Sequence, residues 1–269
     1  MWDNSVENSR IVIVGAGNLA TCLGKALCKV GIRPLAVWSR SEESAVALSS
    51  LLQCSAATDI GSLPDADLVV TAVADDALPQ VARLVAARYP DALVVHTAGS
   101  VPMNVWAEAG ARHYGVFYPM QTFSKAKEVD FSRLGIFVEG CSDDHCDRLM
   151  RLASLLTPMA YRATSEQRAY LHIAAVFACN FANAMYGMAA ELLQGNGLPF
   201  EVMLPLIDET AAKLHTMSPD EAQTGPARRG DATIMNRQRA MLSEPHSEVY
   251  DIVSRYIRQK AMNIKKRLK

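Results

Sequence analysis

The chain has 269 residues, half of them hydrophobic and a fifth charged, and its formal net charge is −1 at pH 7. This length suits two domains, this composition is typical of a soluble globular protein, and the near-zero charge argues against nucleic-acid binding. No apolar run approaches the roughly 18 residues that span a membrane, and the polar start at 1–10 lacks a secretory signal pattern, so we expect a cytoplasmic protein without membrane contact.

Short apolar runs alternate with helical patterns over 1–163. Helices are expected over 18–30, 42–52 and 78–88. Strands are expected at 11–14, 35–38, 54–57, 67–73, 92–96, 114–118 and 135–138. Because these strands are apolar throughout and do not alternate, they suit a mostly parallel sheet covered on both faces. The pattern predicts an α/β fold, with a Rossmann-type doubly wound domain at 1–163.

The glycine turn Gly15-x-Gly17-x-x-Ala20 follows the first strand and opens the first helix. The first glycine permits the tight turn, the second lets the backbone approach a pyrophosphate, and the small third residue lets helix and strand pack closely. Free N–H groups at the helix N-terminus then face the phosphates. The cofactor-binding residues predicted here are Gly15, Gly17, Asn18, Leu19 and Ala20. The alternative is a turn kept only for packing.

The end of the second strand distinguishes NAD from NADP. NAD enzymes commonly carry a carboxylate there that binds the ribose 2′-hydroxyl, but this strand ends in Ser39 and Arg40. A serine hydroxyl and a guanidinium suit a 2′-phosphate, so we predict NADP(H). The alternatives are a surface arginine and a helix cap at Ser39 or Ser41.

Further strand ends should line the cofactor cleft, because ligands of such sheets bind beyond the carboxyl ends of the strands. Small residues that would let the nicotinamide riboside approach are Val73, Ala74, Thr97 and Gly99. At these strand ends, Ser100 and Gln121 are candidate substrate contacts. Asp75 is either a cleft residue or a helix cap.

The second half, 164–269, changes character. One helix, apolar on nearly every side, is expected over 166–193. Further helices are expected over 199–217, with a break near Pro205, and over 231–242 and 247–268. We expect no strand here, so the domain is all-helical. A helix without a polar face needs more than one covering surface, which predicts a homodimer through this domain.

Five segments of the sequence resemble Rossmann-like NADP oxidoreductases with a helical C-terminal domain of unassigned function. They are 13–20, 96–100, 115–123, 172–180 and 224–231, and they span both halves. The family is distantly similar to pyrroline-5-carboxylate reductase, the deazaflavin-dependent NADP oxidoreductases and the β-hydroxyacid dehydrogenases. The resemblance implies an NADP-binding enzyme with a helical domain like the C-terminal domain of 6-phosphogluconate dehydrogenase.

Two departures from related enzymes limit the chemistry that the resemblance implies. In β-hydroxyacid dehydrogenases a lysine and an asparagine one turn apart face the nicotinamide. Asn180 matches that asparagine, but Val176 stands in place of the lysine. Tyr118 stands where prephenate dehydrogenases have the histidine of His-Pro-Met.

Hydride transfer needs a proton donor beside the carbonyl or imine that reacts. His172 is the first candidate, because it is polar in an apolar helix and its intrinsic pKa suits neutral pH. A buried structural histidine is the alternative. Asn180, about 80° around a regular α-helix and roughly 12 Å along it from His172, and Tyr118 are the other candidates. For His96 a structural role is favoured.

The segment 224–231 carries Arg228 and Arg229 beside residues that shape the backbone. Either arginine could bind a substrate carboxylate or phosphate, which predicts an anionic small molecule. The alternative is a plain helix entry with Asp231 in its first turn.

The six cysteines are scattered without a Cys-x-x-Cys pair, so we expect reduced thiols and no metal. The sequence as a whole predicts an NADP(H)-dependent oxidoreductase that transfers a hydride to or from a small, anionic carbonyl or imine substrate. The alternatives are a non-catalytic NADP(H)-binding sensor or assembly protein and a structural dimer.

Overall fold

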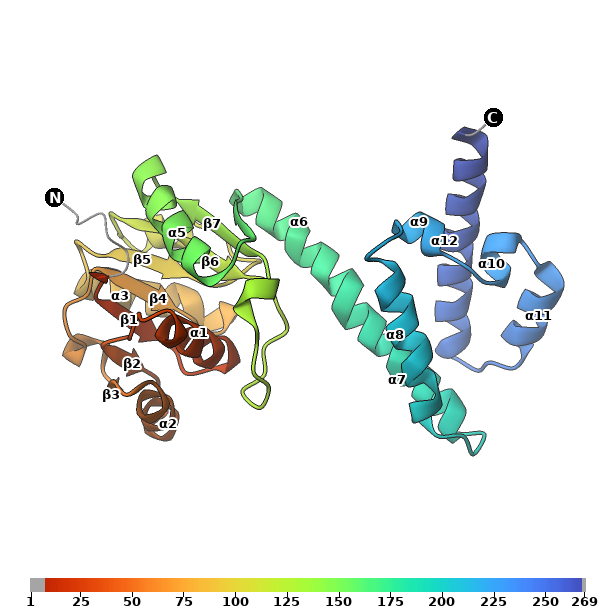
Figure 1. Cartoon of the computed structure of the whole chain (residues 1–269), viewed down its shortest axis with the longest axis horizontal. Helices are drawn as coiled ribbons and strands as arrows, with labels where there is room; N and C mark the ends of the chain where they lie inside the picture. Colours follow the sequence, from red (N-terminus) through yellow and green to blue (C-terminus); the bar gives the residue numbers. More distant parts are fainter. Residues whose placement is uncertain (1–7, 268–269) are drawn as a thin grey trace. The chain divides into compact units, whose positions relative to one another are not determined.

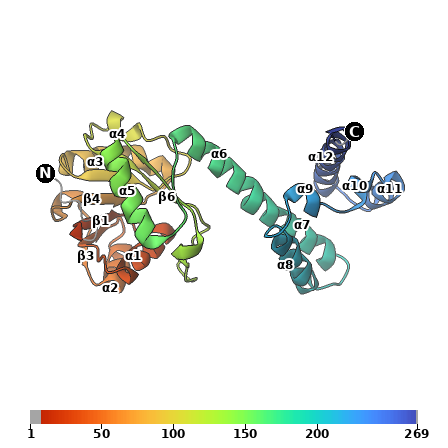
Figure 2. The same ribbon diagram turned by 45° about the horizontal axis from the view of Figure 1, so that its top comes forward.

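The computed structural model describes residues 8–267, and of 265–267 it describes the backbone alone. The chain divides into two compact units, Met1–Val176 and Phe177–Lys269. Figure 1 and Figure 2 show the strands in the first unit and helices in the second. The division falls inside the long helix, whereas the sequence-based boundary between 163 and 164 lies at its beginning; that boundary stays a prediction.

An eight-stranded sheet runs through the first unit in the order β3-β2-β1-β4-β5-β6-β7-β8, counted over residues 8–267. The strands are β1 Ile11–Val14, β2 Ala36–Trp38, β3 Ser55–Ala57, β4 Leu68–Thr71, β5 Leu93–His96, β6 Tyr114–Pro119, β7 Ile136–Gly140 and β8 Ala160–Arg162. Neighbouring strands are parallel except β6 and β7. The strand order reverses at β1 and β4, the switch point where doubly wound sheets bind ligands. The predicted fold class is confirmed.

Six α-helices of the first unit fall within the described residues. They are α1 Asn18–Lys29, α2 Glu42–Leu52, α3 Leu78–Arg88, α4 Val105–Glu108, α5 Asp143–Leu156 and α6 Ser165–Ala175. The sequence pattern predicted α1, α2 and α3 but did not predict α4, α5 or β8. Helix α5 begins at Ser142, whose side chain accepts a hydrogen bond from the His145 N–H, a usual N-cap.

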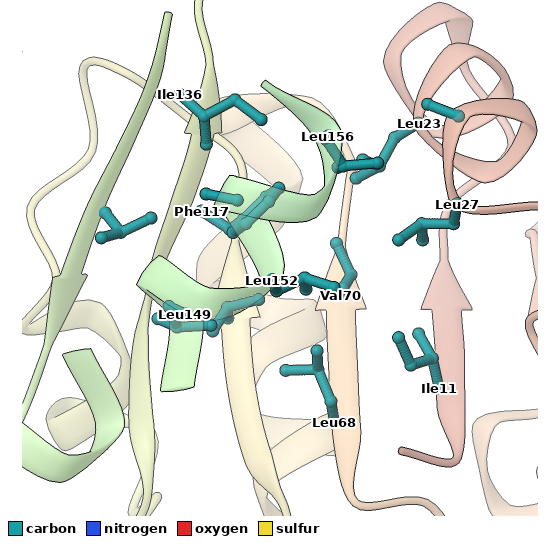
Figure 3. Close-up of a cluster of buried hydrophobic side chains, with 14 of the residues drawn as sticks. Ile11, Leu23, Leu27, Leu68, Val70, Phe117, Ile136, Leu149, Leu152 and Leu156 are labelled. Atoms are coloured by element: carbon teal, nitrogen blue, oxygen red, sulfur yellow. The ribbon is translucent and has the colours of Figure 1, made fainter. Parts of the chain in front are cut away.

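Both faces of the sheet are buried, which explains the continuous apolar strands. Leu27 of α1 and Leu152 of α5 pack with Ile11 on one face (Figure 3). On the other face Val12 packs with Val85 of α3. Successive residues of β1 point to opposite faces and both are fully buried, so a polar residue would find no place in this strand.

The second unit is helical throughout its described part, which confirms the predicted all-helical region. Its helices are α7 Ala182–Gln194, α8 Leu204–Lys213, α9 Pro219–Ala222, α10 Pro226–Arg229, α11 Ala232–Ala240 and α12 His246–Arg267. The break expected near Pro205 is present, because a 3-10 helix ends at Met203 and α8 begins at Leu204. Pro205 lies in the first turn of α8, where its missing N–H costs nothing, after the short 3-10 helix Phe200–Met203.

The long helix starts at a capping box formed by Thr164 and Gln167 and contains a π-helical segment, Val176–Phe181. Over Ser165–Gln194 it is 30 residues long, with a mean hydropathy of 1.4 in an 18-residue window of which no residue is buried. By length and composition this helix could cross a membrane, so the expectation that no apolar run approaches that length is wrong. The core helix of a soluble protein passes the same test, but such a helix is mostly buried, whereas this window is not.

Candidate cofactor site

The glycine turn sits between the ends of β1 and β4. Gly15 has a φ of +124°, and a Cβ atom there would lie 2.1 Å from the Ala72 carbonyl oxygen, so the position requires glycine. Gly17 is the N-cap of α1, and a Cβ there would meet no atom within 4 Å. The first turn of α1 has no side-chain cap, so its N–H groups are available to an anion.

A cleft of about 420 Å³ opens over this turn. Its lining comes from the turn, the ends of β2 and β4, the helices that follow and one residue of the β6–β7 loop. The lining residues are Gly15, Ala16, Gly17, Trp38, Ser39, Arg40, Ser41, Ser44, Ala72, Val73, Ala74, Ala77, Val81 and Lys125. The predicted residues Gly15, Gly17, Ser39, Arg40, Val73 and Ala74 thus meet in one cleft at the switch point of the sheet.

The polar groups at the end of β2 suit a phosphate. Ser41 caps α2 by accepting a hydrogen bond from the Ser44 N–H, 3.3 Å away, and the Ser39 hydroxyl accepts one from the Ser41 N–H. Arg40 forms no ion pair or hydrogen bond with another described residue. No carboxylate is among the described residues that line the cleft. The cleft therefore presents an uncompensated positive charge, which a 2′-phosphate would neutralise.

Three predicted residues at the start of α1 have different surroundings. The Asn18 side chain donates to the Phe123 carbonyl oxygen, 3.1 Å away. Leu19 packs against one hydrophobic core cluster, and Ala20 is buried in another. Only their backbone N–H groups are therefore suited to a phosphate.

Tyr118 lies at the end of β6 against Gly99, which follows β5. A Cβ at Gly99 would lie 2.6 Å from Cζ of the tyrosine ring. Tyr118 is 9% exposed, and its hydroxyl has no hydrogen-bond partner among the described residues. Burial raises the pKa of Tyr118, nearby Asp75 raises it further, and Arg168 opposes both. The group is a protonated, unengaged hydroxyl, which suits a proton donor.

The remaining strand-end residues bond within the first unit. The Thr97 hydroxyl lies 3.5 Å from the Thr71 carbonyl oxygen. Ser100 donates to the carboxylate of Asp75, which is not a helix cap because Ala74 precedes that 3-10 turn. The Gln121 side chain accepts a hydrogen bond from the Thr122 N–H.

His96 is fully buried in β5, and burial together with the charge of nearby Arg168 lowers its pKa to about 3. Burial is the larger of these two effects. The Pro102 carbonyl opposes both as the weakest effect, and it lies outside hydrogen-bonding geometry. The Nδ1 atom accepts a hydrogen bond from the Ala98 N–H at 3.2 Å. His96 is thus a neutral residue of the core, which favours the structural role.

The other predicted catalytic and substrate residues are divided between the units. His172, on α6 of the first unit, is exposed, so the alternative of a buried histidine is wrong. Asn180 lies in the π-helical segment and Arg228 and Arg229 form the end of α10, all in the second unit. The spacing expected between His172 and Asn180 assumed a regular α-helix and does not apply across a π-helical segment. Convergence of these side chains on one site stays a prediction.

Asp231 lies at the entry of a helix, as the alternative for this segment predicted. Its side chain accepts a hydrogen bond from the Ile234 N–H, 3.1 Å away, and so caps α11.

Two features of the first unit were not predicted. Lys125 lines the cofactor cleft from the β6–β7 loop. Arg168 of α6 is fully buried, pairs with Glu139 of β7 and donates to the Val101 carbonyl oxygen at 3.0 Å. These bonds fix the start of α6 on the sheet.

The thiols are unpaired, as the scattered cysteines predict: all six are free. Burial raises the pKa of Cys54 to about 11, so this group is not a reactive thiolate. Within residues 8–267 no three potential metal ligands form a cluster.

Two family models match parts of the chain: a domain of unknown function (DUF2520) over residues 134–257, and shikimate / quinate 5-dehydrogenase over residues 2–110. No curated protein matches. Among solved structures, a putative NADP oxidoreductase from Bacteroides fragilis is 47% identical, with 95% of this chain and 100% of that chain covered and a TM-score of 0.87.

Two more distant structures share the fold. A protein from Thermotoga maritima is 21% identical, with 95% of this chain and 99% of that chain covered and a TM-score of 0.75. An imine reductase from Myxococcus stipitatus in complex with NADP+ is 18% identical, with 94% of each chain covered and a TM-score of 0.67. The similarity extends over both units of the chain.

Proposed function

This chain belongs to the family of the NADP oxidoreductase-like protein from Bacteroides fragilis, and on that premise we propose that it is an NADP(H)-dependent oxidoreductase. The reaction proposed is hydride transfer to or from a small, anionic carbonyl or imine substrate. The observation that carries the proposal is the cleft over Gly15. Arg40 and three serines line this cleft, and none of the described residues that line it is acidic.

The preference for NADP(H) over NAD(H) is tested by calorimetry with both reduced cofactors. The wild type is expected to bind NADPH more tightly than NADH. Arg40→Ala should weaken NADPH about tenfold or more, the value of a charge-assisted hydrogen bond, and leave NADH unchanged. Arg33→Ala is the matched control, since Arg33 binds Gln53 and lies outside the cleft lining. Tighter binding of NADH by the wild type would contradict the proposal.

The protein's contribution to the reaction is to hold a substrate against the cofactor and to move a proton. NADP(H), when bound, supplies or accepts the hydride. We assign the proton to Tyr118, because its side chain is largely buried, its raised pKa keeps the hydroxyl protonated, and the hydroxyl has no hydrogen-bond partner among the described residues. His172 and Asn180 remain candidates for the same role or for orienting the substrate, and Arg228 and Arg229 for binding its anionic group. The direct test is oxidation of NADPH with a panel of keto acids and cyclic imines.

A second candidate function is a non-catalytic NADP(H)-binding sensor or assembly protein. Val176 favours it, because this residue stands where the related hydroxyacid dehydrogenases carry a lysine. Tight NADPH binding without turnover of any keto acid or imine would support this candidate over the enzyme.

We also propose a soluble, cytoplasmic homodimer that associates through the helical unit. The support is the set of large apolar side chains exposed there, among them Leu206, Met241, Ile252 and Tyr256. Light scattering should give twice the mass of one chain, and the protein should stay in the supernatant without detergent. A monomer, or a requirement for detergent, would contradict this.

A further inference from the structure

The loop between β6 and β7 is fastened along helix α1. The Phe123 carbonyl oxygen accepts a hydrogen bond from the Asn18 side chain at 3.1 Å, and the Ser124 carbonyl oxygen lies 3.6 Å from Sγ of Cys22. Farther along, Glu128 pairs with Lys29 at the end of α1. These contacts hold residues 123–128 against α1, the helix whose N-terminus lies at the cofactor cleft.

Lys125 lies within this fastened segment, and its side chain lines the same cleft as Arg40. It forms no ion pair or hydrogen bond with another described residue. The cleft thus contains two cationic side chains, from segments far apart in the sequence, and no acidic residue among the described residues that line it. Two like charges facing one cavity repel each other, and an anion bound between them offsets that repulsion.

The chemistry of the neighbouring groups identifies the anion. Arg40 and Lys125 share the cleft with the hydroxyl-bearing Ser39, Ser41 and Ser44. A phosphate monoester carries between one and a half and two negative charges at pH 7, about what two cations neutralise, and its oxygens accept hydrogen bonds from serine. A pyrophosphate has its own ligands in the N–H groups of α1.

We propose that Lys125 binds the 2′-phosphate of NADP(H) together with Arg40 and determines the choice of cofactor. This inference rests on the proposed function, because it assigns a specificity residue to the same cleft. A solvated surface lysine is the alternative, but the contacts of Phe123 and Ser124 leave the backbone at Lys125 little freedom to turn away.

The test compares Lys125→Ala with Lys127→Ala, a lysine of the same loop outside the cleft lining. Calorimetry is done with NADPH and NADH, and with 2′,5′-ADP and 5′-ADP as fragments. Lys125→Ala should weaken NADPH and 2′,5′-ADP about tenfold, leave NADH and 5′-ADP within about twofold, and flatten the salt dependence of NADPH binding. Lys127→Ala should bind all four like the wild type, and Lys125→Arg should restore most of the loss.

Each other outcome has a distinct meaning. If the wild type prefers NADPH and Lys125→Ala keeps that preference, the assignment of Lys125 is wrong while the proposed function stands. Equal losses for NADPH and NADH would place Lys125 on the pyrophosphate and overturn the inference. If the wild type binds neither cofactor, the proposed function fails and this inference fails with it. Circular dichroism confirms that each variant is folded.

Discussion

Gly99 and Tyr118 lie so close that a Cβ atom at position 99 would stand 2.6 Å from Cζ and 2.9 Å from the hydroxyl oxygen of the tyrosine. Gly99 follows β5, and Tyr118 lies at the end of the neighbouring parallel strand β6. Because Tyr118 is buried, its ring has little room to give way. The absence of a side chain at position 99 therefore sets the position of the tyrosine hydroxyl.

Gly99→Ala should displace the Tyr118 ring. We expect kcat to fall about 100-fold, the scale of an ångström of misplacement, and the free energy of unfolding to fall by about 1–3 kcal/mol from overpacking. Turnover with NADPH and urea unfolding measure the two effects. Full activity in this variant would show that the contact does not position a reacting group.

Tyr118→Phe should leave the fold intact and slow the reaction. The hydroxyl makes no hydrogen bond among the described residues, so its removal costs little stability, while loss of a proton donor lowers kcat by about 100-fold or more. Tyr89→Phe is the matched control: its hydroxyl donates to the Pro64 carbonyl oxygen at 2.8 Å, so that variant should lose about 1 kcal/mol of stability and no activity. Wild-type turnover by Tyr118→Phe would transfer the role to His172 or Asn180.

Gly15→Ala and Gly17→Ala should separate the two functions of the glycine turn. At Gly15 the added Cβ meets the Ala72 carbonyl at 2.1 Å and φ is +124°, so the variant should unfold more easily, by about 2 kcal/mol or more. At Gly17 the space is open, so the variant should keep its stability. NADPH binding should weaken, because the added methyl group keeps the backbone away from the pyrophosphate. Thermal unfolding and calorimetry distinguish these outcomes. Equal destabilisation by both variants would be inconsistent with this geometry.

The pKa of His96, about 3, makes stability dependent on pH. The unfolded chain binds a proton at this residue below its ordinary pKa of 6.5, whereas the folded chain does not until about 3. The unfolded state therefore binds more protons in this window, and stability falls with falling pH by at most about 1.4 kcal/mol per unit. Unfolding in urea at pH 7, 6 and 5 should show a shallower slope for His96→Asn than for the wild type. Identical slopes would mean that His96 takes up a proton in the folded protein.

The Arg168–Glu139 pair should be costly to break. Arg168 has no exposed surface, so Glu139→Leu leaves a buried charge unpaired and should cost about 3–5 kcal/mol, whereas the double variant Arg168→Met/Glu139→Leu should recover part of that loss. Breaking the exposed pairs of Arg162 with Asp143 and Asp147 by Arg162→Ala should cost far less stability, because water screens exposed charges. Chemical unfolding of the three variants checks the order. Similar costs at the buried and the exposed sites would contradict it.

Local sequence chemistry was sufficient for the glycine turn and for the end of β2. Gly15, Ser39 and Arg40 follow apolar strands that are buried side by side in one parallel sheet. The carboxyl ends of these strands therefore lie together at the switch point, which brings the three residues to one site. Lys125 could not be found in this way, because its place depends on how a long loop folds back along α1. A basic residue shortly after the end of β6 was the only local signal.

Helix α5 and strand β8 were missed for a different reason. The helix begins with polar residues after Ser142, but Leu149, Leu152 and Leu156 recur at helical spacing and face the core. That cap and that spacing together could have predicted it. Strand β8 is only three residues long and exposed or half-buried, so it carries no hydrophobic pattern of its own. Its place comes from pairing with β7.

The π-helical segment Val176–Phe181 changes how the long helix should be compared with other sequences. A turn closed by an i→i+5 bond takes one residue more than an α-turn, so the hydrophobic stripe after Phe181 is out of phase with the stripe before Val176. Averaged with a single period of 3.6, two offset stripes look like one helix that is apolar all round. A sequence alignment of this helix should therefore allow a one-residue gap within Val176–Phe181.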